Sequence, residues 1–65
     1  MEAFQMGLFI QNLVEAFAVN AEIEGMKAEN WLRADRGEAQ AYPEEAFQKK
    51  ADHLWGIASA AREIA

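Results

Sequence analysis

The side chains best suited to chemistry are three polar residues that interrupt an apolar helical pattern, together with the only histidine. Asn20, Glu24 and Lys27 recur at helical spacing in the first half of the chain. If the second half folds back antiparallel, Asp52 and His53 should lie opposite them. A buried carboxylate beside a histidine can act as a general acid or base, or hold a ligand. The competing interpretation, which we favour, is structural: Glu24 pairs with Lys27 and His53 is exposed or half-buried.

The sequence lacks the residues that metal centres and catalytic centres usually need. The chain has no cysteine and one histidine. Carboxylate-bridged centres in helical bundles use Glu-x-x-His, whereas Lys50 stands three residues before His53. There is no glycine-rich phosphate loop, and Ser59 is the only serine. We therefore expect a non-enzymatic protein without a cofactor.

Aromatic residues near the expected turn offer a different kind of site. Trp31 and Tyr42 could contact a partner, as aromatic hot spots do. They could also stack on a nucleotide-type ligand in a pocket between subunits, with Arg33 and Lys49 close by. Their structural role would be to cover the end of a small core, which we favour. The candidate contacts for a ligand or partner are Glu24, Lys27, Trp31, Arg33, Tyr42, Lys49 and His53.

Size and charge limit the functional classes. A chain of 65 residues forms at most one domain, and a core this small often depends on disulfides, metals or oligomerisation. Six basic and eleven acidic residues give a net charge of −5, which argues against nucleic acid as a direct partner. The same charge suits a basic protein surface.

A long first helix is expected over about residues 2–36, because this stretch lacks proline and Gly37 can terminate it. Its apolar residues form two stripes at helical spacing. The first stripe is the wider one, and we expect it to face the second helix. It consists of Met6, Ile10, Leu13, Phe17, Ala21, Ala28 and Leu32. The second stripe consists of Leu8, Val19, Ile23 and Met26.

A turn is expected over residues 37–42 and a shorter second helix over about 43–64. Pro43 suits a helix start, because its missing N–H has no partner there. Steps of three and four residues give the second helix its own stripe. That stripe consists of Phe47, Ala51, Leu54, Ala58, Ala61 and Ala65. The sequence thus predicts a single all-α domain, residues 1–65, built as a helical hairpin.

The unequal helix lengths predict self-association. With a tight turn, Ala65 would reach only the level of Val14, and residues 1–13 would extend without a partner. Exposed apolar surface of this size marks an interface, so we expect two hairpins to dimerise into a four-helix bundle. The alternative is a monomeric three-helix bundle, broken near residues 20–25. The expected interface residues are Phe4, Met6, Leu8, Phe9, Ile10, Leu13 and Phe17.

The first nineteen residues contain Glu2, Gln5 and Glu15 and lack a basic start. We therefore expect neither a signal peptide nor a spanning helix. The expected location is the cytoplasm, with no membrane partner.

Two segments, AEIEGMKAEN at residues 21–30 and AYPEEAF at residues 41–47, resemble short uncharacterised helical proteins of tailed phages and prophages. The resemblance implies an oligomer that binds a host protein or sequesters a small signalling molecule. Our main hypothesis is an acidic, homo-oligomeric interaction protein, with the inhibition of a host protein as the phage-type activity. The alternatives are a nucleotide-type sponge and a purely structural oligomer.

Overall fold

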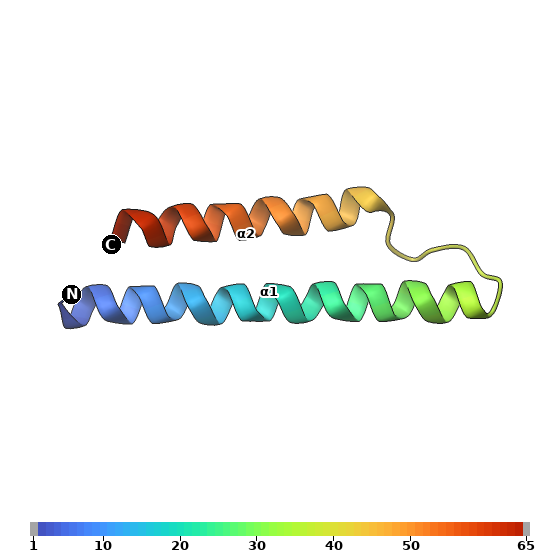
Figure 1. Ribbon diagram of the computed structural model, residues 1–65, viewed down its shortest axis with the longest axis horizontal. Coiled ribbons are helices and arrows are strands. Elements are labelled where there is room, and N and C mark those ends of the chain that lie inside the picture. Colours follow the sequence, from blue (N-terminus) through green and yellow to red (C-terminus); the bar gives the residue numbers. More distant parts are fainter. Residues whose placement is uncertain (1, 65) are drawn as a thin grey trace.

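The computed structural model describes residues 2–64 and has two antiparallel helices (Figure 1). Helix α1 spans Ala3–Asp35 and helix α2 spans Glu44–Ile64. Neither strand nor bridge occurs in this part of the chain. The hairpin measures 53 × 16 × 9 Å, and its radius of gyration is 15.6 Å, against about 11 Å for a compact domain of this length. The predicted all-α helical hairpin is confirmed, and it is strongly elongated.

The limits of α1 follow from its end residues. At the start, the Glu2 N–H donates to the Gln5 side chain at 3.3 Å. At the end, the N–H groups of Gly37 and Glu38 donate to carbonyls one turn back, at Ala34 and Arg33. This pattern is a Schellman motif, and it requires the left-handed φ of +73° that Gly37 adopts. Between these ends α1 is continuous, so the alternative with a break near residues 20–25 is wrong.

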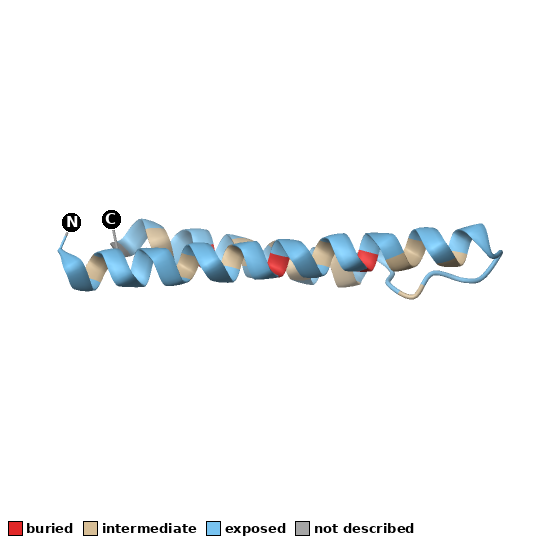
Figure 2. Cartoon of the chain, turned by 90° about the horizontal axis from the view of Figure 1, so that it is seen from below, coloured by how far each residue is buried: buried red, intermediate tan, exposed pale blue. Residues whose placement is uncertain are grey.

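The two helices meet along the second stripe of α1. Val19 and Met26 are buried, and Ile57 of α2 is the only other buried residue among those described (Figure 2). On α2, four residues of its predicted stripe are half-buried, whereas Ala58 is exposed and Ala65 lies outside the described residues. The half-buried four are Phe47, Ala51, Leu54 and Ala61.

The expectation that the first stripe faces α2 is wrong. Phe17 of the first stripe precedes Val19 of the second stripe by two residues, and two residues turn an α-helix by about 200°. The two stripes therefore lie on opposite faces of α1, and contact with one leaves the other in water. All seven residues of the first stripe are exposed.

The connection between the helices is held by one side-chain amide. The Tyr42 N–H donates to Asn30 Oδ1 at 3.0 Å, and Asn30 Nδ2 donates to the Tyr42 carbonyl at 2.8 Å. Residues 36–43 consequently run back beside the last turns of α1 before α2 begins (Figure 1). An extended residue advances about 3.3 Å along the chain, whereas a helical residue advances about 1.5 Å. Each extended residue of the connection can therefore pass about two residues of α1.

This connection corrects the expected overhang. Because it runs back along α1, α2 is displaced toward the N-terminal end, and Ala61 lies beside Phe9 and Leu13. Residues 9–13 therefore do not extend alone. The last turns of α1 extend past the first turn of α2 instead (Figure 1). The level of Ala65 itself is outside the described residues.

We expect Asn30→Ala to lower the free energy of unfolding by about 1–2 kcal/mol, because both hydrogen bonds to Tyr42 are lost. Asn30→Asp should lose less, since a carboxylate can still accept from the Tyr42 N–H. Urea unfolding followed by circular dichroism measures both changes. An Asn30→Ala variant as stable as the wild type would contradict the importance given to this pair.

Candidate interaction surface

The contact between the helices has one polar side. There, Lys50 forms an ion pair with Glu22, and His53 Nε2 lies 3.0 Å from Glu15 Oε1. Both pairs join α1 to α2 and are partly exposed, so each contributes little to stability. They do fix which sides of the two helices face each other. Two carboxylates on α1, Glu22 and Glu15, meet Lys50 and His53 on α2.

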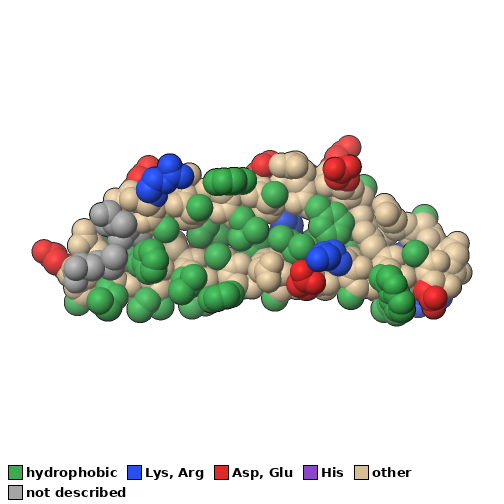
Figure 3. Space-filling view, in the orientation of Figure 1, with side chains coloured by type: hydrophobic (Ala, Val, Ile, Leu, Met, Phe, Trp, Pro, Cys, Tyr) green, Lys and Arg blue, Asp and Glu red, His purple; other side chains and the backbone are tan. Residues whose placement is uncertain are grey.

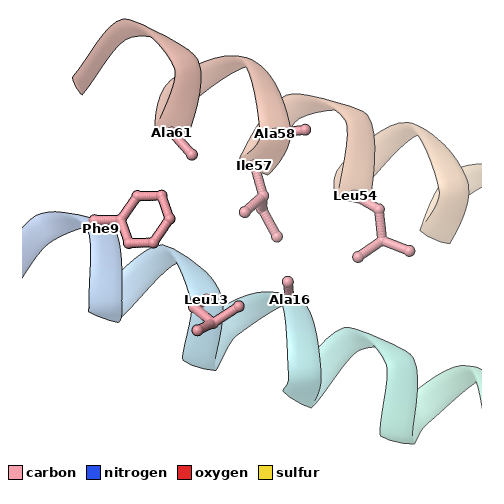
Figure 4. Close-up of a pocket in the computed structure, with 7 residues that line it drawn as sticks. All are labelled: Phe9, Leu13, Ala16, Leu54, Ile57, Ala58 and Ala61. Carbon is pink, nitrogen blue, oxygen red and sulfur yellow. The ribbon is translucent and has the colours of Figure 1, made fainter. Parts of the chain in front are cut away.

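The opposite side of the contact is apolar and hollowed. A groove of about 190 Å³ runs between α1 and α2, and its wall is almost entirely apolar (Figure 4). On the face shown in Figure 3, hydrophobic side chains gather between the two helices and along α1. The residues that line the groove are Phe9, Leu13, Ala16, Leu54, Ile57, Ala58 and Ala61.

The groove is continuous with the exposed first stripe, because Leu13 belongs to both. Phe17 is 66% exposed and Phe4 is 76% exposed, values that are unusual for large apolar side chains in a folded protein. Every residue predicted for the oligomer interface is exposed in the single hairpin. The structure therefore has a long apolar surface on α1, although its cause is the orientation of the helix and not an overhang.

The polar residues that suggested acid–base chemistry do not form one cluster. Lys27 donates to Glu24 at 3.1 Å, whereas His53 contacts Glu15. Asp52 accepts a hydrogen bond from Gln48. Within residues 2–64, no hydrogen bond or ion pair joins the α1 group to Asp52 or His53, and no three His, Cys, Asp or Glu side chains are placed to hold a metal ion.

The residues proposed to contact a ligand near the turn are also separate. Arg33 is paired with Glu29 at 3.0 Å, and Tyr42 is bound through its backbone to Asn30. Trp31 is 67% exposed. None of the described hydrogen bonds or ion pairs links these residues to Lys49. These residues therefore form no common cluster within one hairpin, and the nucleotide-type pocket expected between subunits stays a prediction.

Sequence reasoning missed Asn30 and the two carboxylates that bridge the helices. Asn30 continues the spacing of Ile23 and Met26, so a polar residue at that position could have indicated a partner across the hairpin. An amide offers both a donor and an acceptor, which suits a backbone segment that is not in a helix. Glu15 and Glu22 carried no comparable signal.

Stability should decline as the pH falls through the titration of Glu22. The Lys50 ammonium donates a hydrogen bond to this carboxylate and also attracts it by charge, which lowers the pKa of Glu22 from its ordinary value of 4.5. A lowered carboxyl pKa stabilises the fold above the unfolded value, and this contribution disappears as the pH falls through the folded value. Lys50→Gln should reduce the decline below pH 4.5 in urea unfolding. Lys49→Gln is the matched control and should retain it, whereas equal effects of the two variants would contradict the assignment.

Neither helix within residues 2–64 combines the length and the apolar composition needed to cross a bilayer. Compared with protein-family models, with curated protein sequences and with solved structures, the chain has no match.

Proposed function

We propose that the protein is a non-enzymatic, homo-oligomeric helical interaction protein, in which two hairpins associate through the first stripe. Because that stripe lies opposite α2, the four helices of such a dimer would lie in a row, with the two α1 helices in the middle, and not around the common core of the expected four-helix bundle. One observation carries the proposal. Three apolar residues are buried among those described, while twelve large hydrophobic side chains are exposed. A second copy covers such a surface without requiring a different binding partner.

The accessible area supports a partner of about the size of this chain. A compact monomer of 7.3 kDa exposes about 4,200 Å². This hairpin exposes 5039 Å², and the excess of roughly 800 Å² equals what each partner buries in a standard interface. Association of two copies would bring the exposed area per chain to the value typical of its mass.

The energetics favour the same conclusion. Burying an exposed side chain such as Ile10, Leu13 or Phe17 contributes about 1.5–3 kcal/mol. Association costs about 4–15 kcal/mol in lost freedom of motion. Because each chain of a symmetric pair buries the same residues, three or four such side chains per copy can offset that cost.

A host protein with a basic surface is the partner class that suits the remaining outer surface. Glu44, Glu45 and Asp52 are exposed on α2, away from the first stripe, so they stay accessible when that stripe is covered. With a net charge of −5 per chain, two copies present a strongly acidic particle. The phage-type inhibition implied by the resemblance would then use this acidic surface, with no direct nucleic-acid contact.

The test is the mass of the protein in solution. We expect sedimentation equilibrium at micromolar concentration to give twice 7.3 kDa for the wild type and 7.3 kDa for Phe17→Asp. A charge placed at Phe17 would have to be buried without a partner, which is strongly unfavourable. Gln11→Asp adds the same charge to an exposed position outside the stripe and should remain dimeric. A monomeric wild type would overturn the proposal.

A further inference from the structure

We infer that the dimer is antiparallel, with the first stripe of α1 packed on the first stripe of the second copy and the two-fold axis at the level of Val19. This inference rests on the proposed function and specifies its geometry. In such a pair, residues equally far before and after Val19 lie at the same level on the two chains. Each contact then occurs twice, once on either side of the axis.

Side-chain sizes along this face of α1 are complementary in that arrangement. The large residues Ile10 and Phe17 come to the levels of the small residues Ala28 and Ala21 of the second copy, so the two helices can interdigitate there. Toward the ends of the overlap, Met6 comes to the level of Leu32, and two large apolar residues meet.

The chain direction is also favoured by charge. Glu2, before the first turn of α1, comes to the level of Arg36, just after its last turn. Antiparallel helices place their oppositely charged dipole ends together. A parallel pair would instead set Phe17 against Phe17 and Ala21 against Ala21, which produces crowding at one level and a void at another.

A shorter antiparallel overlap, centred near Asn12, is the main competing register. It would pair only the first halves of the two α1 helices, where both faces carry large side chains. Trp31 and Leu32, which are 67% and 45% exposed, would then stay in water. The overlap centred on Val19 covers Leu32 with Met6 of the second copy and buries more surface.

Distances between spin labels distinguish these registers. The chain has no cysteine, so Gln11→Cys and Ala34→Cys each give one labelled site per chain at an exposed position outside the first stripe. At about 1.5 Å per residue, the axial separations between the two copies are about 24 Å for Gln11 and about 45 Å for Ala34. Pulsed electron paramagnetic resonance on the dimer should show a clearly longer distance at Ala34 than at Gln11, with neither label adjacent to its copy.

Other outcomes overturn the inference in recognisable ways. Equal distances at both sites would indicate a parallel dimer. Nearly adjacent Gln11 labels with Ala34 labels about 66 Å apart would indicate the register centred near Asn12. Either result leaves the proposed dimer intact. A monomeric mass without any dipolar coupling would overturn the proposed function itself.

A bulky residue in place of the small Ala28 gives an independent test. Ala28→Trp should raise the dimer dissociation constant at least tenfold, because Ile10 of the second copy occupies the space in front of Ala28. Ala60→Trp, on an exposed position of α2, is the matched control and should leave the constant unchanged. Circular dichroism establishes that both variants remain helical. An unchanged dissociation constant for Ala28→Trp would overturn the inference.

Discussion

The paired hydrogen bonds between Asn30 and Tyr42 set the level at which the second helix begins. Because the Asn30 amide binds both backbone groups of Tyr42, the connection must return along α1 before α2 starts. That return brings Lys50 to Glu22 and, further along, His53 to Glu15. A tight turn would displace α2 by several residues and separate both pairs. The hydrogen bonds are few and partly exposed, so their effect is on register more than on stability.

The polar residues beside each apolar stripe decide which face of α1 meets α2. Glu15 and Glu22 lie next to the second stripe, on the side where α2 presents His53 and Lys50. The first stripe has more apolar residues but offers no such match to α2. Leaving polar groups unpaired at a helix contact is costly, and the narrower stripe avoids that cost. The wider stripe is then left for another surface.

Local features of the fold were predictable, and relationships between distant residues were not. The absence of proline and the position of Gly37 indicated the long helix, and the spacing of Glu24 and Lys27 indicated their pair. The contacts that determine register join residues 12, 28 and 38 positions apart. Periodicity ranks the faces of a helix by the number of apolar residues, so it favoured the first stripe for the core. It has no means of showing that Asn30 would bind the backbone of Tyr42, and this contact is what removed the expected overhang.

The interactions that set the register of the hairpin are polar, whereas those able to stabilise it are apolar. Exposed ion pairs contribute at most about 1 kcal/mol each, and the three buried side chains among the described residues form a very small core. A fold of this size usually requires an additional source of stability, and the chain has no cysteine for a disulfide. The exposed first stripe is an apolar surface still able to supply it. Association would then complete the fold, and the stability of each hairpin would depend on protein concentration. A host partner that competed for this stripe would unfold the protein it binds, whereas one that binds the acidic side would leave the dimer folded.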